Sequence, residues 1–282
     1  MSAPDFVVIG HAVRDVVPGG WRLGGTVTFA AVQAHRLGLS VGIVTAAGDD
    51  IDIQHELPFA EVVQRRSAVS TSFENVYVAG VRRQGVTSRA DAIPRDAIPD
   101  AWLPAPIVLL GPVLDELAPG LAASLPSAGL RGVSAQGWLR GIDGDGRVVH
   151  QRWAGPPFWP GADVLFVSDE DLSDDRAQLD RWTSEVPVVA MTESWKGARV
   201  YSDGAWRRMP AFPEDEIDPT GAGDTFATAL LVRLRETGDV LEAARFGAAA
   251  ASISVSGIAA ESIPTRDEID ARLRQYPEVA LR

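Results

Sequence analysis

The stretch "DPTGAGDTF", residues 218–226, places a proline, two small residues and two glycines between two aspartates, and a helical run follows it. The first turn of a helix carries N–H groups without intrahelical partners and lies at the positive end of the helix dipole. Because the residues before the helix have almost no side chains, an anion can approach the backbone there. Asp224 stands at the same place with a carboxylate. The stretch therefore predicts a phosphate-binding turn that opens a helix.

Two interpretations of Asp224 stay open at this point. A carboxylate beside a phosphate site can accept a proton from an alcohol while the anion site stabilises a phosphoryl group in transfer, which suits a kinase acting on a hydroxyl. The simpler interpretation is an ordinary N-cap after a glycine turn, and the residues alone favour it because such turns are common. The stretch is neither a Walker A loop nor a GxGxxG fingerprint.

Outside this turn, short apolar runs alternate with helical stretches such as residues 26–38. The runs are typical of buried strands and read "DFVVIGHAV", "VGIVTAAG", "PIVLLGPV", "GVSAQG", "DVLFVSDED" and "VPVVAMTES". Nearly continuous apolar runs suit a parallel sheet that is covered on both faces. We therefore expect a doubly wound, mostly parallel α/β fold with helices on both faces, in one domain over residues 1–282.

Two segments interrupt this alternation. Residues 16–25 are rich in glycine, and polar and apolar residues alternate within residues 72–92, as in a hairpin with one face in water. These segments predict a small β lid over the main sheet. Edge strands accept partners, so the hairpin is also a candidate surface for a homodimer.

Composition excludes several classes of function. Lys and Arg number 26 and Asp and Glu 38, for a net charge of −12, so we expect no nucleic-acid binding. Cysteine is absent, which excludes disulfides and thiolate chemistry. No apolar run approaches the roughly 20 residues that span a bilayer. The start "MSAPDFVVIG" lacks the basic residues of a signal peptide, so we expect a cytoplasmic protein without a membrane partner.

The motifs together resemble the PfkB, or ribokinase-like, carbohydrate kinase family. "DPTGAGDTF" is similar to its C-terminal signature, "VVIGHAVRDVV" to its first strand, and "LGGTVTFAAVQAHRLGLSVGIVTAAGDD" to its N-terminal signature. "VSDEDL" and "VVAMTESWKGARVYSDG" follow in the expected order, so the resemblance covers essentially the whole chain. A motif of several parts in its predicted context is much stronger than a lone match. The resemblance implies a ribokinase-like fold and a kinase that uses ATP and Mg²⁺.

The resemblance also implies roles for residues in the two signatures. Asp224 would be the catalytic base, and Gly221, Ala222 and Gly223 the anion hole around the transferred phosphoryl group. Asp15 would accept hydrogen bonds from substrate hydroxyls, since one carboxylate can bind two neighbouring hydroxyls.

Further residues complete the expected acceptor site. Gly24 and Gly25 would let the substrate approach bare backbone. Phe29 stands where the family often has an Asn, which argues against ribose itself. The quoted segments look closer to the inositol-kinase-like branch, so a cyclitol such as myo-inositol is one hypothesis, with another sugar or a nucleoside as alternatives. His11 lies near Asp15 and is a candidate pocket residue, although a packed or surface histidine is the commoner case.

On the donor side, Ser168 and Asp171 match the family's Asn-x-x-Glu motif, which supports magnesium and phosphate. An acid acting through water is enough there, because Mg²⁺ keeps several waters. The segment "TESWKG" places Thr192, Ser194 and Gly197 near the nucleotide.

The last expected contacts flank the glycine turn. Thr220 would contact the nucleotide, and small residues around Gly247 and Ala251 would wall the adenine pocket. Asp218 and Thr220 stand where some members of the family bind an activating cation, so K⁺ is a further candidate cofactor. The competing hypothesis for the whole chain is a catalytically inactive regulator that binds a small ligand on the same fold.

Overall fold

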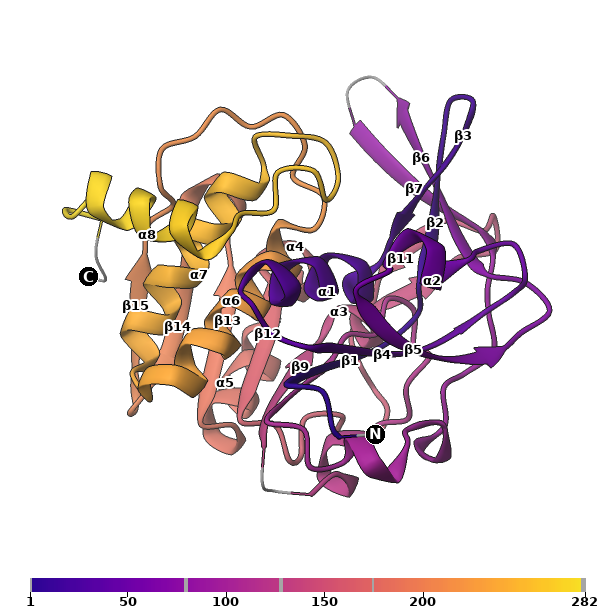
Figure 1. Ribbon diagram of the computed structural model, residues 1–282, viewed down its shortest axis with the longest axis horizontal. Coiled ribbons are helices and arrows are strands. Elements are labelled where there is room, and N and C mark those ends of the chain that lie inside the picture. Colours follow the sequence, from indigo (N-terminus) through magenta and orange to yellow (C-terminus); the bar gives the residue numbers. More distant parts are fainter. Residues whose placement is uncertain (1, 79–80, 127–128, 174, 280–282) are drawn as a thin grey trace.

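The computed structural model describes residues 2–78, 81–126, 129–173 and 175–279. A nine-stranded sheet forms its centre, with the strand order β15-β14-β13-β12-β9-β8-β1-β4-β5, which Figure 1 shows from left to right. The strands are β1 (Phe6–Ile9), β4 (Val41–Ala47), β5 (Ala60–Arg66), β8 (Ile107–Leu110), β9 (Leu130–Ser134), β12 (Val164–Ser168), β13 (Val188–Thr192), β14 (Ala198–Ser202) and β15 (Ala205–Met209).

The six runs predicted as buried strands form the middle of this sheet. They are β13, β12, β9, β8, β1 and β4, and all six run parallel to one another. At one edge β5 continues the parallel order, and at the other edge β14 and β15 are antiparallel. The predicted mostly parallel α/β fold is confirmed.

Side chains of the central strands alternate between two apolar cores. In β1, Phe6 and Val8 pack on one face, against α1, α6 and α7, whereas Val7 and Ile9 pack on the other face. This alternation follows from the two-residue period of a strand. The helices are α1 (Thr26–Arg36), α2 (Ile53–Glu56), α3 (Gln136–Leu139), α4 (Asp169–Leu172), α5 (Arg176–Glu185), α6 (Ala222–Thr237), α7 (Val240–Ser254) and α8 (Arg266–Gln275), with 3₁₀ turns at Arg95–Ala97, Asp100–Trp102, Leu121–Ser124 and Ser194–Lys196.

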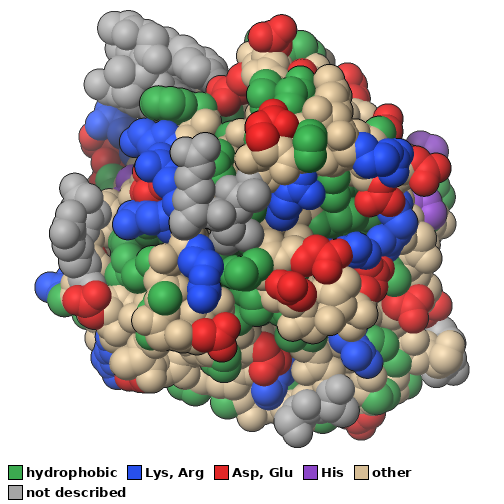
Figure 2. Space-filling model, turned by 90° about the vertical axis from the view of Figure 1, so that its left-hand side faces the viewer, with side chains coloured by type: hydrophobic (Ala, Val, Ile, Leu, Met, Phe, Trp, Pro, Cys, Tyr) green, Lys and Arg blue, Asp and Glu red, His purple; other side chains and the backbone are tan. Residues whose placement is uncertain are grey.

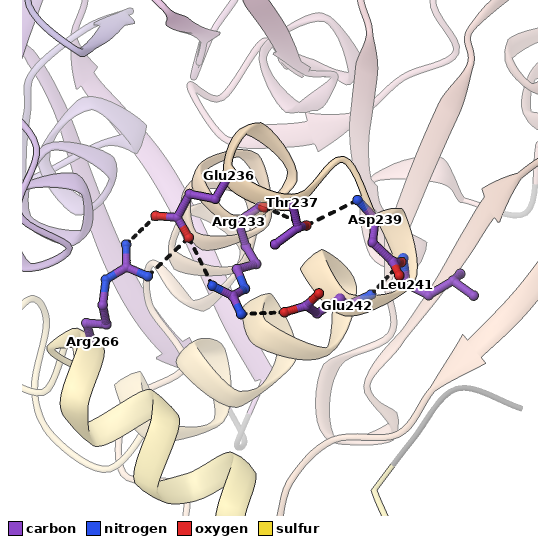
Figure 3. Close-up of polar contacts among 7 residues, drawn as sticks. All are labelled: Arg233, Glu236, Thr237, Asp239, Leu241, Glu242 and Arg266. Atoms are coloured by element: carbon purple, nitrogen blue, oxygen red, sulfur yellow. Dashed lines mark hydrogen bonds and ion pairs between the residues drawn. The ribbon is translucent and has the colours of Figure 1, made fainter.

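Helix α6 extends from the glycine turn into the core and is tied down at its far end. Gly238 ends it in the left-handed conformation, and Asp239 caps α7 by accepting from the N–H groups of Leu241 and Glu242. Figure 3 shows how Arg233 of α6 pairs with Glu236 and with Glu242 of α7, while Glu236 also pairs with Arg266 of α8. These contacts join the three helices.

A second sheet stands above one end of the first (Figure 1). It has the order β3-β2-β6-β7 and contains β2 (Val13–Val17), β3 (Gly20–Gly24), β6 (Thr71–Val78) and β7 (Val81–Ser88). The segments 16–25 and 72–92 lie within or next to it, except for residues 79–80, which are outside the described residues. A small hairpin of β10 (Arg140–Ile142) and β11 (Val148–His150) reaches up to this sheet, where the N–H of Val86 donates to the carbonyl of Gly146.

Charged side chains are mixed on the face of the molecule near α8. Figure 2 shows acidic and basic groups interspersed there, with no single broad basic field. Within the described residues, no helix combines the length and the apolar character needed to cross a membrane.

Candidate active site

One cavity of about 470 Å³ lies between the main sheet, the start of α6 and the second sheet. Strand ends, helix starts and lid residues contribute to it, as expected for an open α/β sheet that binds ligands beyond the carboxyl ends of its strands. Of the predicted site residues, it is lined by Asp15, Gly25, Phe29, Ser168, Asp171, Thr192, Ser194, Gly197, Thr220, Gly221, Ala222, Gly223, Asp224 and Ala251. Residues predicted separately from the two ends of the chain thus share one space.

The glycine turn forms the N-terminus of α6. Gly221 is the N-cap residue in the left-handed conformation, with φ of 78°. A Cβ atom at this position would lie 2.1 Å from the ring of Phe29, so both the backbone and the packing require glycine. A Cβ atom at Gly223, in contrast, would meet no atom within 4 Å, since this residue faces the open cavity.

The donors at this helix start are available to a ligand. The N–H of Ala222 donates to the carbonyl of Pro219, at 3.2 Å. Within the described part of the chain, the N–H groups of Gly223 and Asp224 have no backbone acceptor. Two unpaired N–H groups at the positive end of a helix of 16 residues are suited to binding an anion.

Asp218 stabilises the turn through two hydrogen bonds and does not line the cavity. Its Oδ1 accepts from the N–H of Thr220, at 3.0 Å, and its Oδ2 accepts from the N–H of Ala259, also at 3.0 Å. These bonds fix the approach of the chain to Gly221. No group of three or more acids and histidines suited to a metal is found among the described residues. The K⁺ site stays a prediction.

Asp224 lies half-buried in the cavity, and its pKa is raised to about 6. Burial is the main cause, because surrounding protein atoms replace water around the charge. The hydroxyl of Thr26 and the charge of Arg140 act in the opposite direction, while Asp171 adds to the rise. A carboxyl with a pKa near 6 is largely ionised at neutral pH and is a stronger base than an exposed aspartate.

Asp15 lines the opposite part of the cavity from β2. Gly24 lies beside it on β3, and a Cβ atom there would come within 2.0 Å of Asp15 Oδ2. The missing side chain of Gly24 therefore makes room for the carboxylate. We expected Gly24 to line the cavity, but it does not. Gly25 does line it, in the left-handed conformation that begins α1.

His11 does not reach the cavity. Its side chain is fully buried, with Nδ1 2.8 Å from the hydroxyl of Thr71 and Nε2 2.9 Å from the carbonyl of Asp91. The carbonyl of Asp91 can only accept, so Nε2 donates to it, and the Thr71 hydroxyl also accepts from the N–H of Ala90, at 3.0 Å. His11 thus links the end of β1 to Thr71, at the start of β6, and to Asp91, which follows β7. His11 therefore matches the alternative of a packed histidine, and not that of a pocket residue.

Asp171 is buried within a polar cluster. Its Oδ1 pairs with Arg140 Nε at 3.0 Å and with His150 Nδ1 at 3.4 Å, and its Oδ2 accepts from the hydroxyl of Ser168 at 2.8 Å. Burial alone would raise the pKa of Asp171, but the charge of Arg140 and the hydrogen bonds outweigh it and lower the pKa to about 2. The His150 pKa is raised, mainly by its hydrogen bond to Asp171.

The sequence predicted that Asp171 supports magnesium, for which an acid acting through water is enough, and this role stays a prediction. Both oxygens of Asp171 are engaged by protein groups, and the side chain is 3% exposed. A divalent cation would be held here by phosphate oxygens and water, which suits the preference of Mg²⁺ for few protein ligands.

Part of the cavity lining is apolar. It includes Phe212, Ala248, Ala251 and Val255. Ser194, whose backbone has φ of 53°, and Trp195, which is 76% exposed, line the cavity as well. Gly247 does not line the cavity, because it faces α6, where a Cβ atom would lie 2.9 Å from the carbonyl of Phe226. Its small size serves helix packing.

Sequence reasoning missed several lining residues. Thr26, Gln84, Gln136 and Arg140 reach the cavity from four different elements, and none of them had been assigned a role in the site, although Thr26 lies within the N-terminal signature. Thr26 follows Gly25 directly, so its place at the start of a helix was a usable signal. The other three became visible only with the fold.

Comparison with known proteins gives a consistent result. Residues 156–266 match the model of the pfkB family carbohydrate kinases. A cytidine kinase of Thermococcus kodakarensis is 26% identical over 273 residues, which cover 86% of this chain and 93% of that protein. An inositol 3-kinase of Zea mays is 35% identical over 127 residues, which cover 43% of this chain and 33% of that protein.

Solved structures share the fold over nearly the whole chain. A pyrophosphate-dependent ribokinase-family kinase, in complex with a pyrophosphate analog and myo-inositol, has a TM-score of 0.77 and 22% identity, covering 95% of this chain and 99% of its own. The fructokinase of Xylella fastidiosa with bound ATP has a TM-score of 0.74 and 18% identity, covering 97% and 99%. At these identities, the likeness establishes the fold.

Proposed function

We propose that this chain, which belongs to the pfkB family of carbohydrate kinases, transfers the terminal phosphoryl group of ATP to a hydroxyl of a small polyol through Asp224. The main support is the arrangement at the start of α6. Unpaired N–H groups, an open glycine and a carboxylate with a pKa of about 6 lie within one turn. Asp15 faces the same cavity. A site suited to the transferred phosphoryl group thus lies close to a base.

In the proposed reaction, the carboxylate of Asp224 takes the proton of the acceptor hydroxyl. The acceptor oxygen then forms a bond to the terminal phosphorus of ATP. The bond between that phosphorus and the bridging oxygen breaks, and its electrons stay on ADP. The N–H groups of Gly223 and Asp224 stabilise the charge on the phosphoryl oxygens during the transfer, while Mg²⁺ held by the phosphates would neutralise part of it.

The acceptor is proposed as a sugar, a cyclitol or a nucleoside. The names of the similar proteins include kinases of cytidine and of inositol, and myo-inositol is bound in one structure of the same fold. Asp15, Thr26 and Gln84 offer polar contacts at the acceptor end, beside the apolar walls of Phe29 and Phe73. This mixture suits a ring that carries several hydroxyls.

ATP is the proposed donor, although a similar fold serves pyrophosphate in another kinase. The apolar slot between Phe212 and the small residues Ala248 and Ala251 supports a flat base. Pyrophosphate would leave this slot without a ligand.

A panel of acceptors and donors tests the function. Purified protein is incubated with ATP or pyrophosphate and with ribose, fructose, myo-inositol, cytidine and adenosine, and NMR assigns the phosphorylated hydroxyl. We expect transfer from ATP to at least one acceptor and no transfer from pyrophosphate. Tight binding of ATP and an acceptor with no product from any pair would favour the alternative of an inactive regulator.

The pKa of Asp224 predicts how activity depends on pH. The base acts only when ionised, so kcat/KM should level off above about pH 7, reach half of its maximum near pH 6 and fall about tenfold for each unit below about pH 5. A profile from pH 4.5 to 8.5 with the best acceptor measures this. A constant value down to pH 4.5 would mean that no group with a pKa near 6 takes the proton.

A further inference from the structure

The charges that line the cavity are strongly unbalanced. Seven acidic residues face it, namely Asp15, Asp169, Glu170, Asp171, Glu214, Glu216 and Asp224. Among the lining residues that the structure describes, Arg140 is the single cation. A donor with several negative charges must enter this space, and like charges repel strongly where water is excluded. The position of Arg140 therefore matters more than that of an ordinary surface arginine.

Arg140 is held in a fixed orientation. Its Nε donates to Asp171 Oδ1 at 3.0 Å, and its terminal nitrogens lie beside the side-chain amide of Gln136, whose oxygen accepts from them, with Nη2 at 2.8 Å, in the amide orientation that satisfies both groups. A guanidinium carries five N–H donors, so these contacts leave others available toward the cavity. Asp171 stays ionised through its low pKa and anchors the arginine without filling its outer edge.

The backbone around Arg140 is equally constrained. Its carbonyl accepts from Gln151 Nε2 at 3.1 Å, across the hairpin of β10 and β11. Just before it in α3, Gly137 lies so close to Pro112 that a Cβ atom would be 2.5 Å from the proline ring. These contacts fix the start of β10 against the end of β8, where the cavity begins. The backbone that carries the guanidinium is therefore held beside the cavity.

We propose that Arg140 is a catalytic residue whose guanidinium binds the phosphoryl group as it passes from ATP to the acceptor. This inference rests on the proposed function. As the bond to the bridging oxygen breaks, negative charge grows on ADP and on the phosphoryl oxygens, and a fixed guanidinium stabilises it without further reorganisation. The same residue influences the base, because its charge lowers the pKa of Asp224 against the effect of burial.

The proposal is tested with Arg140→Gln and Arg140→Lys. Arg131→Gln is the matched control, because Arg131 lies at the other end of β9 from the cavity and is also half-buried, with Nε 3.3 Å from Asp163 Oδ2. We expect Arg140→Gln to lower kcat about 100-fold, with the KM of the acceptor within about threefold of wild type. Arg140→Lys keeps the charge but not the planar fork and should lose about tenfold.

Chemical rescue separates catalysis from folding. Added guanidinium ion, at concentrations below those that unfold the protein, should restore part of the activity of Arg140→Ala and none of that of Asp224→Asn. Equal kcat in wild type, Arg140→Gln and Arg140→Lys would overturn the proposal, as would an equal loss in Arg131→Gln. Wild-type protein without turnover would instead refute the proposed function. In that case, calorimetric titration with ATP still tests Arg140, and unchanged affinity in Arg140→Gln refutes its phosphate contact.

Discussion

Asp224→Asn should lower kcat about 10³- to 10⁴-fold while ATP still binds. The amide has the size and shape of the carboxyl but cannot accept the proton of the acceptor hydroxyl. Its neighbours Gly221 and Gly223 keep their conformation, so the anion site remains. Single-turnover rates measure the loss, and calorimetric titration measures the binding of ATP. A variant that keeps one tenth of wild-type kcat would exclude Asp224 as the base.

The same substitution should make the protein more stable at neutral pH. The folded-state pKa of Asp224 is raised above its ordinary value of 3.8, so the folded state binds this proton more tightly than the unfolded chain. The stabilisation by this group is complete below pH 3.8 and is lost as pH rises through about 6. An amide removes the cost of the buried charge, about 1–2 kcal/mol after allowance for partial exposure. Urea unfolding at pH 7.5 and at pH 4 measures it, and the gain should disappear at pH 4.

The sequence predicted the central sheet because buried parallel strands have an unmistakable composition. β1 and β4, for example, are apolar on both faces, and each ends in small or polar residues at the same edge of the sheet. The glycine turn could be predicted as well, because only glycine fits at position 221, where the chain packs against Phe29. The periodicity of a sequence does not indicate whether a glycine faces a ligand or makes room for another part of the protein. Gly24 and Gly247 were predicted to face ligands, whereas they make room for Asp15 and for Phe226.

Arg140 shows why part of the site could not be predicted. It lies in "GWLRGIDG", a segment without a motif, and reaches the cavity through a hairpin turn and an ion pair with Asp171, 31 residues later. Such an ion pair depends on the packing of α3, β10 and α4 together. His11, in contrast, was predicted to line the pocket because it is close to Asp15 in the sequence. In the structure it is buried against Thr71, where the chain enters the second sheet.

Gly223→Ala should lower kcat/KM about 1,000-fold without harming the fold. A methyl group here meets no protein atom within 4 Å, because the space beside it is the cavity. In the proposed complex that space holds phosphoryl oxygens against the N–H groups of Gly223 and Asp224, and displacing them weakens both binding and alignment. Since alanine favours helix over glycine, the free energy of unfolding should rise by up to about 1 kcal/mol.

Gly221→Ala and Gly144→Ala make this experiment decisive. At Gly221 the added methyl group collides with the ring of Phe29 in a left-handed backbone, so this variant should lose about 2 kcal/mol or more of stability together with activity. At Gly144 the methyl group also meets open space, but this residue does not line the cavity, and activity should be unchanged. Full activity in Gly223→Ala would mean that no phosphate approaches this helix start. The anion site, and with it the transfer through Asp224, would then have to lie elsewhere.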